Sequence, residues 1–242
     1  TMSLNDLIEE LRAKRLREVS EKKTRKKEAP SFSRKPDSHL EAECPDKVRA
    51  AVYKKIIERY ADTIGLWEEK TIPELKALVN PEDEAIARVK AKLFDEMREG
   101  KPAWEYSFEE GFLEFLKAAL EYCFKLKPVN ADLTVSYWLK PSEIVELQAA
   151  DPFDKAIFLC SLLESAGGRA KVRVVELEEG GTHAVVLTQW DGKILLLDAS
   201  CSSEFLADSS EEDVLLKHSF EGKKIGKSLY EFSNAEYSDF EE

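Results

Sequence analysis

A histidine and an aspartate in the second half of the chain have the spacing of a catalytic pair. His183 begins one apolar, β-branched stretch, Asp198 lies near the end of the next, and Asp191-Gly192 falls between them. Asp-Gly favours a two-residue hairpin turn, which would make His183 a diagonal neighbour of Asp198, roughly 7–8 Å away. An imidazole oriented by a carboxylate is what a nucleophilic site requires of its second and third members.

A helix is predicted just before these residues. Asp151 is a favoured N-cap, Pro152 fits the first helical position, and Asp154 adds negative charge to the first turn. The body of the helix is almost wholly apolar, which predicts a central helix that is buried on most sides. Gly167 and Gly168 are expected to end it.

Strand patterns follow this helix. Three strands are predicted, Ala170 to Leu177, His183 to Trp190 and Lys193 to Ala199. A short helix is predicted to start near Ser209. A last strand, Lys227 to Phe232, would extend the sheet. The last ten residues are acidic and are expected to be mobile unless a basic segment holds them.

An ordered set of short motifs runs through this region. The set comprises Asp151, Asp154-Lys155-Ala156, Leu162-Leu163, Gly167, Ala170-Lys171-Val172, His183-Ala184 and Leu197-Asp198-Ala199, preceded by Trp138, Pro141, Ser142 and Glu143. It resembles the core of the transglutaminase-like superfamily, whose members carry a Cys, His, Asp triad on a papain-like fold. The resemblance implies an α+β protein with a transglutaminase-like core, in which a central buried helix packs on an antiparallel sheet of three to four strands, and with a helical N-terminal half.

By the same resemblance, Pro152 occupies the position of the catalytic cysteine, while His183 and Asp198 match the rest of the triad. Loss of a covalent nucleophile can lower turnover about a millionfold, roughly 8 kcal/mol of transition-state stabilisation. We therefore expect a catalytically inactive binding or scaffold protein. It would hold a protein or peptide in a vestigial cleft near His183 and Asp198, with Trp138, Asp151 and Asp154 as ligand-binding residues.

Other interpretations remain open. His183 and Asp198 are also compatible with a polar pair that only stabilises the sheet, or with a hydrolase that uses water or Cys201 as nucleophile. Cys160 lies among apolar neighbours and is expected to be inert. Cys44 and Cys123 have no pairing pattern.

No metal or cofactor is expected from sequence spacing. His39, His183 and His218 are far apart in the chain, and no His or Cys pair has the spacing of metal ligands.

Composition predicts one substantial globular core. The 242 residues are 43% hydrophobic and carry a net charge of −12, while residues 11–27 contain nine basic side chains and two acidic ones. Nucleic acid is therefore not an expected partner except through this basic arm, which could instead contact an acidic partner or the acidic body of the chain, or be a solvated charged helix. The absence of a signal-peptide pattern or a membrane-length apolar run favours a cytoplasmic protein. The many charged residues, 35%, with few Gln and Asn, resemble a thermophile composition.

The N-terminal half is predicted to be helical. We expect a charged helical arm and linker over 1–44, a helical part over 45–128, and the core with its acidic tail over 129–242. Helices are predicted from Pro45 to Ile64, after an Asn80-Pro81 cap, and after a capping box at Ser107.

Overall fold

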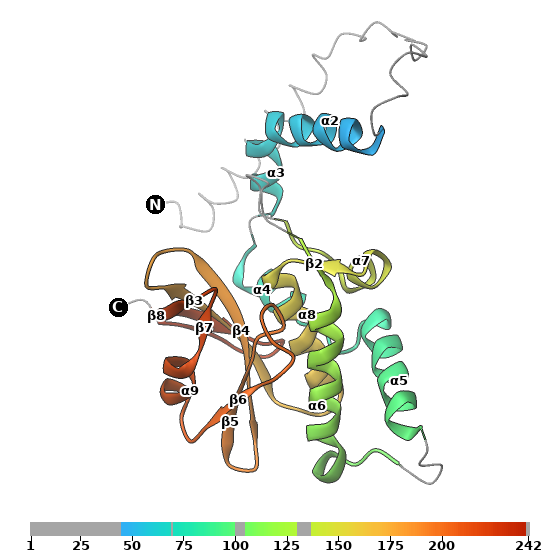
Figure 1. Ribbon diagram of the computed structural model, residues 1–242, viewed down its shortest axis with the longest axis vertical. Helices are drawn as coiled ribbons and strands as arrows, with labels where there is room; N and C mark the ends of the chain where they lie inside the picture. Colours follow the sequence, from blue (N-terminus) through green and yellow to red (C-terminus); the bar gives the residue numbers. More distant parts are fainter. Residues whose placement is uncertain (1–44, 69, 100–104, 130–136, 241–242) are drawn as a thin grey trace, which may run out of the picture. The chain divides into compact units, whose positions relative to one another are not determined.

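A computed structural model of the chain describes residues 45–68, 70–99, 105–129 and 137–240 (Figure 1). The chain divides into two compact units, Thr1–Ala50 and Ala51–Glu242. The basic arm at 11–27, His39 and Cys44 lie outside the described residues. The division into three parts expected from the sequence remains a prediction.

The first part of the described chain is helical, as predicted. Its helices are α2 (Pro45–Arg59), α3 (Ala61–Glu68), α4 (Ile72–Leu78), α5 (Glu84–Arg98) and α6 (Phe108–Lys125). The single helix predicted from Pro45 to Ile64 is wrong, because the chain forms two helices that are interrupted at Tyr60. The sequence patterns do not predict a helix at the position of α4.

Two of the predicted helix caps are wrong in detail. The Asn80 side-chain oxygen accepts from the Glu82 amide, 3.1 Å away, and so closes a turn before the helix. Asp83 caps α5 instead, with its Oδ1 2.7 Å from the Ala85 amide nitrogen. Ser107 precedes α6 as expected, but its side chain makes no capping hydrogen bond.

The core sheet is antiparallel and larger than predicted. Its strands are β3 (Ala170–Leu177), β4 (Thr182–Trp190), β5 (Lys193–Leu197), β6 (Leu206–Asp208), β7 (Ser219–Phe220), β8 (Lys223–Phe232) and β9 (Tyr237–Asp239). Their order is β6-β5-β4-β3-β8-β7, with β9 paired to β8. Short strands β1 (Lys127–Pro128) and β2 (Ala149–Ala150) form a separate parallel pair, and α7 (Pro141–Leu147) lies between them in sequence.

The β4–β5 hairpin has the predicted register. Trp190 pairs with Lys193, and Val186 pairs with Leu197. Asp191 and Gly192 both have positive φ, 49° and 71°, as a type I′ turn requires.

Two helices cover opposite faces of the sheet. On β4, Ala184 and Val186 belong to the large core that contains α8 (Pro152–Ser165), whereas Val185 and Leu187 belong to a smaller cluster with α9 (Glu211–Lys217). This alternation follows from the two-residue period of a strand. Figure 1 shows α9 on one side of the sheet and α8 with α6 on the other. The α+β class, with a buried central helix on an antiparallel sheet and helices before it, is confirmed.

Residues 233–240, the described part of the tail expected to be mobile, are held against the sheet, which corrects that expectation for these residues. Tyr237 pairs with Phe232 through β9, and the Phe240 ring lies 4.4 Å from the Arg173 guanidinium carbon. The same guanidinium binds Glu231. Strand pairing and a cation–π contact therefore hold this segment.

In the part of the chain that the structure describes, no helix combines the length and the apolar character needed to cross a bilayer.

Candidate functional site

The structure brings His183 and Asp198 together at one end of the β4–β5 hairpin. His183 Nε2 lies 2.7 Å from Asp198 Oδ2. Asp198 follows the last paired residue of β5, and the hairpin register sets it diagonally across from His183. Both side chains are buried, with residue exposures of 1% and 3%. The proximity expected from spacing is present, while the role of the pair remains a prediction.

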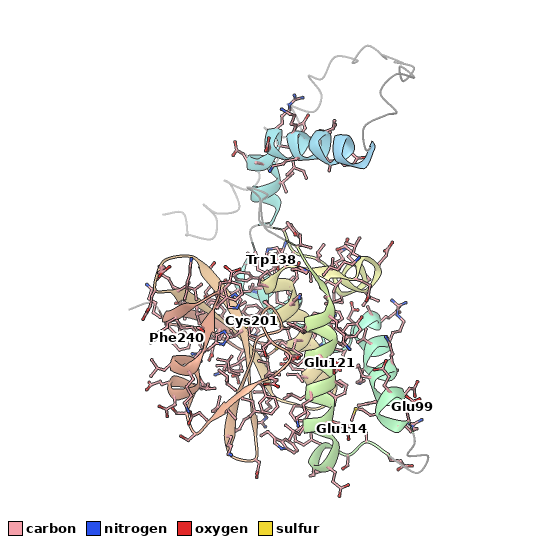
Figure 2. All side chains as sticks on the ribbon, in the orientation of Figure 1. Glu99, Glu114, Glu121, Trp138, Cys201 and Phe240 are labelled. Carbon is pink, nitrogen blue, oxygen red and sulfur yellow. The ribbon has the colours of Figure 1, made fainter. Side chains whose placement is uncertain are left out.

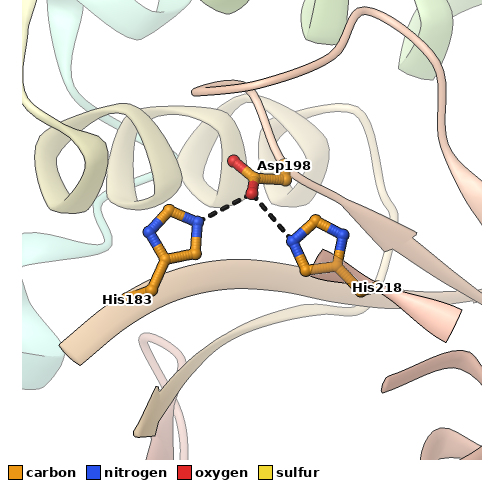
Figure 3. Close-up of side chains that lie close together, drawn as sticks. All are labelled: His183, Asp198 and His218. Atoms are coloured by element: carbon orange, nitrogen blue, oxygen red, sulfur yellow. Dashed lines mark hydrogen bonds and ion pairs between the residues drawn. The ribbon is translucent and has the colours of Figure 1, made fainter. Parts of the chain in front are cut away.

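A second histidine completes a three-residue cluster. His218 directly follows α9, and its Nε2 lies 2.9 Å from the same Asp198 oxygen (Figure 3). The two imidazole rings are nearly parallel, with centroids 6.3 Å apart. The sequence contained no local signal for this contact, because His218 is 20 residues from Asp198.

The cluster holds Asp198 in its ionised form. Burial alone would raise the pKa of Asp198, but hydrogen bonds from His183 and His218 outweigh burial and hold this pKa well below its usual range. The other carboxylate oxygen accepts from the Ser200 amide at 2.9 Å. Both imidazoles contact the same buried oxygen, Asp198 Oδ2. The arrangement can therefore act either as a hydrogen-bonded anchor or as a set of metal ligands.

An aromatic ring covers the histidine. The Phe220 and His183 rings are stacked, with centroids 3.8 Å apart and planes 18° from parallel. Phe220 belongs to β7, two residues after His218. The dyad is therefore almost fully buried, and the cleft expected near His183 and Asp198 remains a prediction.

The start of α8 approaches the same end of the hairpin. Asp151 caps the helix, with its Oδ1 2.8 Å from the Asp154 amide, and Pro152 is the first helical residue, as predicted. Lys155 is buried and its Nζ lies 3.3 Å from the Ala199 carbonyl oxygen. Burial lowers the pKa of Lys155, an effect opposed by the nearby Cys123 and Asp198. This contact links the second turn of α8 to the residue after Asp198.

Asp154 is an ionisable group held in an apolar setting. Its Oδ1 accepts from the Leu139 amide at 3.1 Å, whereas its buried Oδ2 has no hydrogen-bond partner among the described residues. Burial, and then the charge of Asp151, raise the pKa of Asp154 to about 8. The carboxyl group is therefore protonated over much of the neutral pH range.

The described cysteines are poorly suited to act as nucleophiles. Cys123 and Cys160 are fully buried, and burial raises the pKa of both thiols far above the ordinary value. Cys201, labelled in Figure 2, is exposed and its Sγ lies 3.9 Å from the Asp198 carbonyl oxygen. Burial of its thiol and the charge of Asp198 raise its pKa to about 12. The buried position expected for Cys160 is confirmed, whereas its lack of reactivity remains a prediction.

A pocket of about 640 Å³ lies elsewhere on the core. Its lining includes two acidic residues, Glu164 at the end of α8 and Glu231 on β8. It also includes two basic residues, Arg169 just before β3 and Lys171 on β3. None of the six sequence-predicted site residues lines it. Trp138 instead packs edge-on against Phe153, with ring centroids 6.3 Å apart.

Comparisons with known proteins give distant similarities of fold. The chain is similar to LapG of Legionella pneumophila, with a TM-score of 0.45 and 14% identity over 77% of this chain and 87% of that one. The calcium-bound form of that protein gives the same values. A proposed cysteine protease of Cytophaga hutchinsonii gives a TM-score of 0.33 and 12% identity, over 73% of this chain and 61% of that one. Similarities at this level carry no conclusion about activity.

No protein-family model and no curated protein matches the sequence.

Proposed function

We propose that this chain is a transglutaminase-like protein that has lost thiol catalysis and acts by binding a protein or peptide. The observation that carries the proposal is Pro152 at the first position of α8, the helix whose second turn bonds the hairpin end that carries Asp198. A helix N-terminus lowers a thiol pKa, so this position suits a cysteine nucleophile. Proline offers no group to activate.

The burial of the remaining dyad supports a structural role for it. A substrate carbonyl must come within about 3–3.5 Å of the reacting groups. His183 is 1% exposed, and the ring of Phe220 lies against it. The pair therefore fastens the end of the hairpin rather than meeting a substrate.

Binding is assigned to the 640 Å³ pocket instead of the vicinity of the dyad. The pocket offers carboxylates from Glu164 and Glu231 together with the cations of Arg169 and Lys171. One oxygen of Glu164 is buried without a hydrogen-bond partner among the described residues, and burial raises the pKa of this residue to about 7. A peptide supplies amide donors and acceptors that would satisfy such a mixed polar lining.

Loss of thiol catalysis is tested with a peptide-amide substrate and a thiol-directed peptide electrophile. The full chain should release no amine from the substrate. Any slow labelling should disappear in a Cys44→Ser/Cys201→Ser variant, because the other two thiols are buried. Turnover that is abolished by His183→Gln would contradict the proposal.

Binding in the pocket is tested by amide NMR spectra of the labelled chain titrated with pools of unstructured peptides. A bound peptide should shift the resonances of Arg169, Thr188 and Tyr237, which line the pocket, and should leave those of Cys201 unchanged. An Arg169→Ala/Lys171→Ala variant should bind the peptide with lower affinity. Shifts centred on Cys201 instead would place the binding site at the dyad.

A further inference from the structure

We propose that His183, Asp198 and His218 form a binding site for a divalent transition-metal ion of the zinc class, a property independent of the binding function above. The three side chains come from separate segments and each offers one ligand atom, and these atoms all lie within 4.8 Å of one another. Two imidazoles and one carboxylate are a ligand set used for Zn²⁺ and other first-row metals.

The geometry is close to that of a coordinated ion. Zinc bonds of about 2.0–2.1 Å at tetrahedral angles place neighbouring ligand atoms about 3.3–3.4 Å apart. In the structure, Asp198 Oδ2 lies 2.7 Å from Nε2 of His183 and 2.9 Å from Nε2 of His218. Widening these separations by about half an ångström would replace the hydrogen bonds with metal bonds.

The two imidazoles converge on the same side-chain oxygen. Figure 3 shows both imidazoles presenting Nε2 to one carboxylate oxygen from different sides. The amine of Lys155 bonds the carbonyls of Phe124 and Ala199, and it interacts with Asp198 only through its charge among the contacts described.

The surroundings favour a buried site with three protein ligands, which leaves a further coordination position for water or another small ligand. The three ligand residues are 1%, 3% and 6% exposed, and Phe220 covers His183 on the ring face. An ion here would tie the segment after α9 to the end of the β4–β5 hairpin. Hard cations such as Ca²⁺ prefer six to eight oxygen ligands, so this nitrogen-rich set would discriminate against them.

The binding test uses the tag-free full chain after removal of metals with a chelator. Calorimetric titration should give one Zn²⁺ per chain, Co²⁺ should produce visible absorption bands, and Zn²⁺ should raise the melting temperature. Ca²⁺ and Mg²⁺ should have none of these effects. Absence of stoichiometric Zn²⁺ binding would overturn the proposal.

Matched variants identify the ligands. His183→Gln and His218→Gln each keep an amide donor for Asp198 but remove an imidazole, and each should weaken Zn²⁺ binding more than about 100-fold, beyond what loss of an outer-shell partner typically costs. His39→Gln and Cys201→Ser are controls that should bind as tightly as the unmodified chain. Equal affinity in the His218→Gln variant would overturn the ligand set.

X-ray absorption of the unmodified chain with one Zn²⁺ gives a readout that does not depend on the folding of variants. It should show nitrogen and oxygen scatterers near 2.0–2.1 Å, with the multiple scattering of two imidazoles. A sulfur scatterer near 2.3 Å would instead place the ion at a cysteine and refute the site.

Discussion

Nε2 of His218 lies 2.9 Å from Oδ2 of Asp198, although 20 residues separate the two in the chain. The contact anchors the segment after α9 to the end of the β4–β5 hairpin. Since Asp198 is buried and ionised, removal of a donor leaves a charge that water cannot fully solvate. The hydrogen bond should therefore contribute measurably to stability.

Replacing His218 by alanine should lower the free energy of unfolding by about 2 kcal/mol, the typical effect of losing a hydrogen bond to a buried charge. Urea denaturation in the presence of chelator measures it. His218→Gln retains a donor and should recover much of the loss. The neighbouring Lys217 is exposed and pairs with Asp208 at the surface, so its replacement by alanine is a control that should cost only about 0–1 kcal/mol. Equal losses for His218→Ala and His218→Gln would show that the donor is not what matters.

The raised pKa of Asp154 predicts that stability falls as the pH rises. The folded chain keeps a proton on this carboxyl up to about pH 8, whereas the unfolded chain releases it near pH 4. The unfolded state therefore binds fewer protons between these values, and the free energy of unfolding should decrease by up to about 1.4 kcal/mol per pH unit. Denaturation at pH 5, 6 and 7 tests this slope.

Asp154→Asn is the matched variant for this slope. The amide oxygen can still accept from the Leu139 amide, but the side chain no longer titrates. The variant should have a shallower pH dependence and greater stability at pH 7. A remaining slope of the same sign is expected from Glu164, whose pKa is raised by burial. An unchanged slope in the variant would exclude Asp154 as its source.

Most of the hairpin could be predicted because its signals are local. Asp191-Gly192 requires two residues of positive φ, and alternation on either side fixes the register once the turn is set. The same applies to α8, where Asp151 and Pro152 define the start. The hairpin register and the start of α8 each depend on only a few neighbouring residues.

The rest of the site depends on contacts between distant segments. His218 carries no motif, and it reaches Asp198 only because α9 packs across the second face of the sheet. Likewise, β9 and Phe240 lie in an acidic stretch that composition alone describes as mobile. The position of Lys155 could be read from its motif, but not its burial or its contact with Ala199.

Gly168 is predicted to be intolerant of a side chain. A Cβ at this position would lie 2.4 Å from two ring carbons of Phe112 and 3.0 Å from the Leu163 carbonyl oxygen. Because Phe112 is fully buried, Gly168→Ala should cost about 1–3 kcal/mol through overpacking. Thermal denaturation measures the loss.

Gly180→Ala separates steric overlap from backbone strain. Gly180 has a φ of +84°, and a Cβ there would have no neighbour within 4 Å. Gly180→Ala should therefore lower the free energy of unfolding by about 1 kcal/mol, because of the left-handed backbone alone. A Phe112→Leu change should partly rescue Gly168→Ala and should not rescue Gly180→Ala. Failure of this rescue would argue against the contact with Phe112.

A cysteine introduced at Pro152 tests whether this is the position of the lost nucleophile. In a Cys44→Ser/Cys201→Ser background, the new thiol should be the one that reacts with iodoacetamide in the folded chain. The helix N-terminus should bring its pKa, measured from the pH dependence of alkylation, below the ordinary value of about 8.5. His183→Gln should then raise that pKa, because the catalytic unit that the proposal assumes would pair the thiol with this imidazole. Identical values with and without His183 would mean that the helix start and the dyad never formed one catalytic unit, and the proposed loss of thiol catalysis would have no basis.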